Sequence, residues 1–295
     1  MLKHLSRALT ALAFLFAPAV HAQDAVQDAD PALWVVKDED TTIYLFGTVH
    51  VLKPGLSWFD EAVKAAFDKS DEVVLEMIQP DQATMGSLVM KTALNIGGPT
   101  ITEQLPADKR AAYAKALTDS GIAPSDLDPF HPWYAAVALS VLPLRKLGYD
   151  PESGAEAMIT ASAKAAGKQL VGLETAEQQI GYFAALPDTL QVKFLVSTVD
   201  DYPKLGDELG KMITSWAAGD PETLGKTMNE GLRETPEIGK ILLTDRNARW
   251  ADWIDKRLAK PGTVFVAIGA GHLAGDDSVQ AFLAKRNLKA TRIPY

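Results

Sequence analysis

The sequence contains no cysteine, and it has only five histidines in 295 residues. Without cysteine the chain can form no disulfide, no thiolate metal site and no cysteine nucleophile. It also lacks two common hydrolase signatures, the G-x-S-x-G nucleophile elbow and the H-E-x-x-H zinc helix. Stability must therefore come from packing, and a hydrophobic fraction of 47% over this length is enough for a sizeable core.

No apolar run is long enough to span a bilayer as a helix, which takes ~20 residues. The run from Ala8 to Val20 instead has the pattern of a signal peptide, because Lys3 and Arg7 precede it and "VHA" at its end offers a cleavage site. We therefore expect cleavage after Ala22. The product would be periplasmic or secreted and would keep no stable membrane anchor.

Basic residues are fewer than acidic ones, 29 against 38. After removal of residues 1–22 the formal net charge changes from −9 to −11, since Lys3 and Arg7 are lost and no acid is. This charge disfavours nucleic acid and anionic membranes as partners, because both require basic patches. No sequence pattern indicates an oligomer. Residues 23–32 would form a short solvated leader.

Two of the few histidines end the same pattern, Gly-x-x-His. One copy is "GTVH", ending at His50, and the other is "GAGH", ending at His272. Each follows an apolar run that predicts a buried strand, at 41–47 and 263–269. Open α/β sheets bind ligands at the carboxyl edge of their strands. We therefore expect both imidazoles to lie in one site.

The apolar pattern predicts an α/β fold with a single domain over residues 33–295. Two further buried strands are expected at 72–76 and 168–174. The stretches near 80–148 and 181–260 have helical patterns, so we expect large insertions that form a cap over a smaller sheet. No long linker divides the chain.

The regions around the two motifs share the order strand, Gly-x-x-His, amphipathic helix, strand. This order suggests a central sheet built from two related halves that bring His50 and His272 together. The alternative is that such a unit is simply the commonest one in α/β proteins. Helix starts are indicated by capping patterns at Ser57 with Asp60 and at Thr175 with Gln178.

Two acids end predicted strands. Glu76 follows "VVL" and Glu174 follows "LVGL", so neither lies on a solvated face. Charged side chains are almost never fully buried unless they are paired. Each glutamate therefore needs a partner. The alternative for either one is a cap on a helix N-terminus or a salt bridge to an arginine.

Arg246 and Asn247 interrupt the apolar stripe of a helix expected after Pro236, since Leu242 and Trp250 lie four residues before and after Arg246. The guanidinium could neutralise a buried glutamate. It could also bind a carbonyl, carboxylate or phosphate of a substrate as a planar fork. Both interpretations place it near the acids.

Two neutral imidazoles and one carboxylate form a ligand set suited to a divalent metal such as Mn, Co, Fe or Zn. Such a metal supports hydrolysis at neutral pH. A second carboxylate would serve as general base, and Arg246 would stabilise an oxyanion. The competing interpretation uses no metal and makes His50 or His272 the general base.

Six segments of the sequence form a recognisable set: "YLFGTVHVL", "VVLEM", "GYDPESGAEAMI", "KQLVGLETAEQQ", "DRNARWADWI" and "FVAIGAGHLAGDDSV". In this order they resemble the motifs of the TraB/GumN family, which includes the animal TIKI proteins. The resemblance extends from about Leu33 to the C-terminus. It implies a metal-dependent, metalloprotease-like hydrolase that cleaves peptide bonds.

The same resemblance implies a division of roles. It assigns the metal to His50, Glu76 and His272, with Glu174, Arg246 and Asn247 as supporting catalytic residues. Ile78 stands where the family often has an acid, so Glu174 or Glu156 would have to substitute for a third carboxylate ligand. Distant relatives that are esterase-like or bind haem keep two alternatives open, an esterase-like hydrolase and a haem- or metal-binding protein without turnover.

Overall fold

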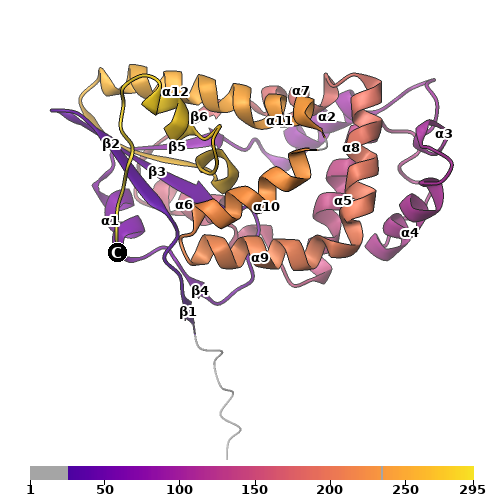
Figure 1. Ribbon diagram of the computed structural model, residues 1–295, viewed down its shortest axis with the longest axis horizontal. Coiled ribbons are helices and arrows are strands. Elements are labelled where there is room, and N and C mark those ends of the chain that lie inside the picture. Colours follow the sequence, from indigo (N-terminus) through magenta and orange to yellow (C-terminus); the bar gives the residue numbers. More distant parts are fainter. Residues whose placement is uncertain (1–25, 234) are drawn as a thin grey trace, which may run out of the picture.

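The computed structural model describes residues 26–233 and 235–295, so the predicted signal peptide lies outside the described residues. Its centre is a mixed six-stranded sheet with the order β6-β5-β7-β3-β2-β8 (Figure 1). The strands β3, β5, β6 and β7 are parallel, and β2 is antiparallel to both of its neighbours. The strands are Leu33–Lys37 (β2), Thr41–Thr48 (β3), Glu72–Met77 (β5), Gln169–Glu174 (β6), Gly262–Gly269 (β7) and Thr291–Arg292 (β8).

The four predicted strands are confirmed as β3, β5, β6 and β7, with ends within one residue of the prediction. The predicted burial is wrong for β6, which lies at the edge of the sheet and is mostly half-buried, whereas the other three are buried at their centres. Their apolar runs are nearly continuous because helices cover both faces of the sheet. α1 (Glu61–Lys69) and α6 (Ala155–Ala165) pack on one face, and α12 (Asp245–Leu258) and α13 (Val279–Ala284) pack on the other. Alternate strand residues serve the two cores: Phe46, Leu75 and Phe265 face the first, and Leu45, Val74 and Val266 face the second.

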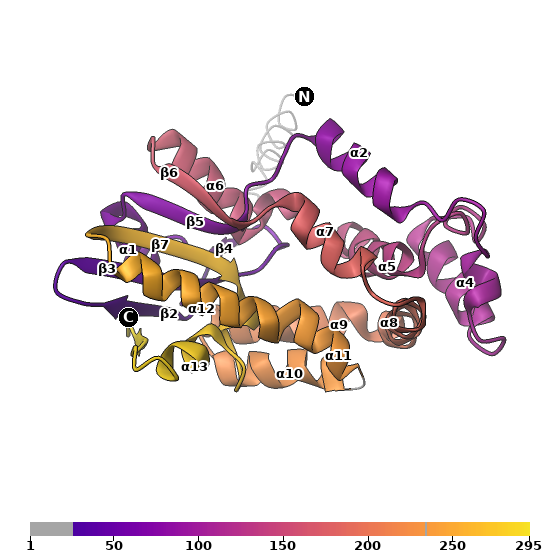
Figure 2. The ribbon, with the colours of Figure 1, turned by 90° about the horizontal axis from the view of Figure 1, so that it is seen from above.

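The remaining helices extend the molecule beyond the end of the sheet toward which the parallel strands point (Figures 1 and 2). Several of them share a separate buried cluster that includes Tyr113, Leu117, Leu139 and Leu195, whereas Trp216 and Leu224 lie in the first core of the sheet. Among the described residues, no helix is long and apolar enough to cross a membrane. These helices are α2 (Gln82–Ala93), α3 (Ile101–Gln104), α4 (Arg110–Ser120), α5 (Pro132–Lys146), α7 (Ala176–Ala184), α8 (Asp188–Asp201), α9 (Leu205–Ala217), α10 (Pro221–Arg233) and α11 (Pro236–Gly239).

The two halves suggested by the Gly-x-x-His repeat are alike only in part. Their first strands, β3 and β7, are parallel neighbours at the centre of the sheet. Their helices, α1 and α13, lie on opposite faces. Their last strands differ, because β5 pairs inside the sheet whereas β8 is a two-residue edge strand.

Three local expectations need correction. Part of the expected solvated leader is packed, since β1 (Gln27–Asp28) pairs with β4 (Leu56–Ser57) and Ala29 is buried. Ser57 begins no helix; it lies in β4 and donates a hydrogen bond to Asp60, the residue before α1. The strand β2 was not predicted, because it lies next to the edge strand and its Trp34 and Val35 are only half-buried.

Candidate active site

The two Gly-x-x-His motifs leave neighbouring strands at the same edge of the sheet. β3 and β7 pair in parallel, and Thr48 at the end of β3 lies opposite Gly269 at the end of β7. Glu76 and Glu174 lie at the ends of β5 and β6, the strands that follow β7 in the sheet. Because parallel strands end at one edge, the fold brings these four sequence motifs together.

Arg246 of α12 joins the two acids. Its Nη2 donates hydrogen bonds to Oε2 of Glu76 at 2.6 Å and to Oε2 of Glu174 at 2.8 Å, and its Nε donates to both oxygens of Glu174 at 3.0 and 3.1 Å. The exposed fractions of these three side chains are 9%, 13% and 3%. Buried charges require partners. Arg246 therefore pairs with two buried glutamates, which agrees with the first of the two interpretations that the sequence leaves open.

The charges of this group are fixed by its surroundings. Burial disfavours the ionised form of Glu76. The positive charge that His272 gains in acid, the charge of Arg246 and the Gly269 N–H, which donates to Oε1 at 2.7 Å, nevertheless lower the pKa of Glu76 to about 2. Although burial opposes the charge of Arg246, both glutamates raise its pKa. Glu76 and Arg246 are therefore both charged at neutral pH.

A π-helical turn places Arg246. The sequence predicted one continuous helix after Pro236, but α11 leads into a π-helix at Lys240–Thr244 before α12 begins. The N–H of Asp245 donates to the carbonyl of Lys240, five residues back. Nη1 of Arg246 donates to the Leu242 carbonyl at 3.1 Å. π-Helical turns are rare overall, but those that occur are often found at functional sites.

His272 is a buried, neutral imidazole of one tautomer. Asn247 uses its Nδ2 to donate to the Asp277 carbonyl at 2.7 Å, so its Oδ1 faces Nδ1 of His272, at 2.5 Å, and accepts the proton there. Nε2 therefore carries the lone pair, and it accepts from Nη1 of Arg246 at 3.1 Å. Burial lowers the pKa of His272 to about 3, against the opposing charge of Glu76.

His50 lies beside this cluster and has a different partner. Its Nδ1 is 2.7 Å from Oε1 of Glu156, at the start of α6, and Thr48 donates to the same oxygen at 2.5 Å. Glu156 raises the pKa of His50, although solvent weakens the effect because 73% of the side chain is exposed. No described hydrogen bond or ion pair joins His50 to Glu76 or His272.

A close backbone contact fixes the His50 loop against α6. The Ala155 N–H donates to the Val49 carbonyl at 2.9 Å, and a Cβ placed on Gly154 would lie 2.1 Å from the His50 carbonyl oxygen. Gly154 has a φ of −64°, which any residue can adopt, so space alone requires glycine here. The segment "PESGAE" thus fits the Gly-x-x-His loop through its backbone.

We predict that Gly154→Ala destabilises the fold by roughly 1–3 kcal/mol, the usual cost of forcing atoms into a packed site. The measurement is the free energy of unfolding in urea. Gly86→Ala is the matched control, because Gly86 is exposed in α2 and a Cβ added there would meet no atom within 4 Å. Alanine at this position should stabilise the helix by up to about 1 kcal/mol. Equal effects of the two substitutions would contradict the contact.

Three residues of this site were missed from the sequence. Gln179 donates to Glu76 at 3.1 Å and to Glu174 at 3.2 Å, and the Tyr182 hydroxyl donates to Glu174 at 2.9 Å. Arg249 donates to the Tyr182 hydroxyl at 2.8 Å. A signal for the first two existed, because the confirmed Thr175–Gln178 capping box sets the phase of α7 and puts residues three apart on one face.

Comparison with known proteins agrees with the motifs. A profile of the TraB/PrgY/gumN family matches residues 32–292. The chain belongs to this family. One relative of this TraB/PrgY/gumN protein is YbaP of Escherichia coli (strain K12), 24% identical over 258 residues that cover 86% of this chain and 92% of YbaP. Another, from Treponema pallidum (strain Nichols), is 22% identical over 273 residues that cover 86% of this chain and 80% of the relative. Both are described as uncharacterized, and no solved structure matches this chain.

Proposed function

We propose that this protein is an exported hydrolase whose site is the carboxyl-edge cluster, with peptides as the leading substrate class and a divalent metal as cofactor. The observation that carries the proposal is His272. Its buried ring is neutral, Asn247 fixes the proton on Nδ1, and the Nε2 lone pair faces Arg246 and Glu76. A neutral imidazole oriented by a hydrogen bond at its other nitrogen is the usual form of a histidine metal ligand.

The donor set fits a divalent cation in two respects. Nε2 of His272 and Oε1 of Glu76 are 3.6 Å apart, near the separation of about 3.4 Å expected for two ligands of one tetrahedral ion. Oε2 of Glu156 is buried and has no described hydrogen-bond partner, so it is open to a cation. In the structure, no three His, Asp or Glu side chains among the described residues form a metal-binding group. Arg246 instead donates hydrogen bonds to His272 and Glu76, and His50 pairs with Glu156.

In this proposal His272 and Glu76 hold the cation, and His50 or Glu156 completes the set. The chemistry supplied by a cation there is polarisation of the scissile carbonyl and of an attacking water. The protein's own side chains orient the ligands and supply positive charge. Asn247 holds the ring of His272, and Arg246 offers a positive charge to a developing oxyanion. Where Glu156 completes the set, His50 stays free of the metal, and its raised pKa lets it donate a proton to the leaving group.

Hydrolysis without a metal is the second candidate, and the position of Arg246 favours it. The guanidinium already supplies a cation within 3.1 Å of His272 and 2.6 Å of Glu76. The exposed His50, held at Nδ1 by Glu156, leaves Nε2 for proton transfer. The expected loss for His50→Ala is at least about 100-fold in either scheme.

The deciding experiment measures Mn, Co and Zn bound per chain after chelator treatment, together with hydrolysis of peptide and ester substrates. We expect one metal ion per chain, lost in His272→Ala and kept in His131→Ala, a histidine at the start of α5 that lies outside the cluster. Far-UV circular dichroism checks that each variant is folded, and the exposed His50→Ala provides a variant without a core change.

Each outcome separates the schemes. Metal binding with hydrolysis that a chelator abolishes supports the metal-dependent scheme. Hydrolysis that survives the chelator but fails in His50→Ala supports the metal-free scheme. Absence of both metal binding and hydrolysis of any peptide or ester tested would overturn the proposal.

A further inference from the structure

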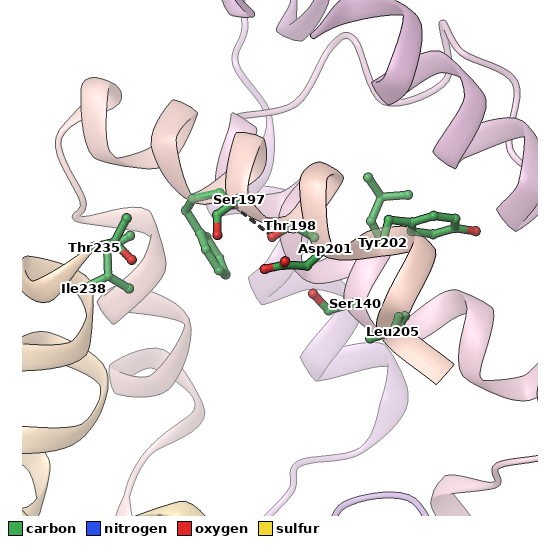
Figure 3. Close-up of a pocket in the computed structure, with 10 residues that line it drawn as sticks. Ser140, Ser197, Thr198, Asp201, Tyr202, Leu205, Thr235 and Ile238 are labelled. Carbon is green, nitrogen blue, oxygen red and sulfur yellow. Dashed lines mark hydrogen bonds between the residues drawn. The ribbon is translucent and has the colours of Figure 1, made fainter. Parts of the chain in front are cut away.

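A second candidate binding site lies among the helices. A cavity of about 180 Å³ opens between α5, α8 and the start of α11 (Figure 3). Its apolar wall consists of Leu139, Phe194, Leu205 and Ile238. None of its lining residues belongs to the cluster around Arg246. For scale, an apolar cavity of about 150 Å³ is large enough for benzene.

The polar wall of this cavity accepts hydrogen bonds. The hydroxyl of Ser140 donates to the Ala136 carbonyl and that of Thr198 donates to the Phe194 carbonyl, both at 2.9 Å. Each hydroxyl proton is therefore used within its own helix, and the oxygen presents lone pairs. Asp201 adds a carboxylate close to both hydroxyls (Figure 3). The cavity is also lined by Ser197 and Thr235, but these three acceptors are best matched by a ligand that donates several hydrogen bonds.

Charge at this wall is negative and has no described partner. Asp200 pairs with Lys109 at 2.6 Å, but no described ion pair involves its neighbour Asp201. Asp201 is the last residue of α8, where the helix dipole is negative.

We propose that this cavity binds a primary ammonium group carried on a small apolar body. The ammonium has three donors and a positive charge, which match the two hydroxyl oxygens and the carboxylate of Asp201. The apolar body would lie against Phe194 and Ile238. For a ligand of this size we expect a dissociation constant on the order of 1 mM. This site is independent of the proposed hydrolase site.

The test is a titration of the purified protein with benzylamine at pH 7, followed by NMR chemical shifts or calorimetry. Benzyl alcohol, which has the same ring and no charge, is the ligand control. We expect saturable benzylamine binding that weakens at least tenfold in Asp201→Asn. Asp200→Asn is the matched variant, because it removes the adjacent carboxylate, which pairs with Lys109, and it should leave binding unchanged.

Three results would overturn the inference. These are the absence of saturable benzylamine binding at millimolar concentrations, equal binding of benzyl alcohol, and unchanged binding in Asp201→Asn. Asp201 is exposed, so its substitution is expected to leave the fold intact, and a thermal melt of each variant checks this.

Discussion

Replacement of Arg246 by methionine is expected to lower the free energy of unfolding by about 3–5 kcal/mol, as the loss of one partner from a buried ion pair does. The substitution leaves Glu76 and Glu174 in the protein interior without their common cation. It also removes the guanidinium that stacks 4.6 Å from the ring centre of Trp250. Urea denaturation at pH 7 measures the change.

Arg249→Met is the control for this prediction. Arg249 lies one helical turn further along α12 and is half-exposed; its described contacts are a hydrogen bond to Tyr182 and a longer ion pair with Glu174, at 3.7 Å. Its replacement should cost less than about 1 kcal/mol, as is usual for exposed ion pairs. If the two substitutions destabilised the protein equally, the buried position of Arg246 would be wrong.

The effect of Arg246→Met should also depend on pH. In the folded wild type the pKa of Glu76 is about 2, below the ordinary value of 4.5. Its ionised form therefore stabilises the fold fully above pH 4.5, and this stabilisation is lost as the pH falls toward 2. Without the positive charge of Arg246, the pKa of the Glu76 carboxyl should be less strongly lowered. The difference between variant and wild type should thus be largest near neutral pH and should shrink in acid.

The four parallel strands of the sheet can be predicted from the sequence because burial leaves a recognisable apolar pattern within each strand itself. β3 and β7 are buried on both faces, so their apolar runs are nearly unbroken and can be recognised without knowing the neighbours. The Gly-x-x-His motifs follow those runs directly. Since parallel strands end at one edge, their common location also follows from the sequence.

The pairing of charges could not be predicted in the same way. His50 was grouped with Glu76 and His272, yet its partner is Glu156, more than a hundred residues away on α6. Which acid meets which base depends on how helices dock on the sheet, and spacing along the chain carries no such information. The π-helical turn before Arg246 is a second example, because apolar spacing alone does not show which turn of a helix holds an extra residue.

The sequence motifs alone leave two roles open for Arg246. The two interpretations drawn from the sequence, neutralisation of a buried acid and binding of a substrate, both require an arginine near Glu76 and Glu174. The four hydrogen bonds to these acids agree with the first interpretation. The second remains a prediction, because a guanidinium held this way can still present charge to a ligand at the edge of the cluster.

The second large effect is expected from His272, which should make the protein less stable in weak acid. Its pKa is about 3 in the folded state, well below the ordinary 6.5. Between these values the unfolded chain binds a proton that the folded protein does not. Stability is therefore complete above pH 6.5 and falls as the pH decreases, with a slope that approaches 1.4 kcal/mol per pH unit, about the value for one proton.

Urea denaturation of wild type and His272→Gln between pH 6.5 and 5 tests this slope, since glutamine keeps a polar side chain and does not titrate. This window lies above the range in which Glu76 takes up a proton. His50 acts in the opposite sense, because its pKa is raised and its contribution is lost only as the pH rises. His131→Gln replaces a histidine outside the cluster and is the control for the substitution itself. If His272→Gln kept the wild-type slope, His272 could not be the buried neutral imidazole on which the proposed metal site depends.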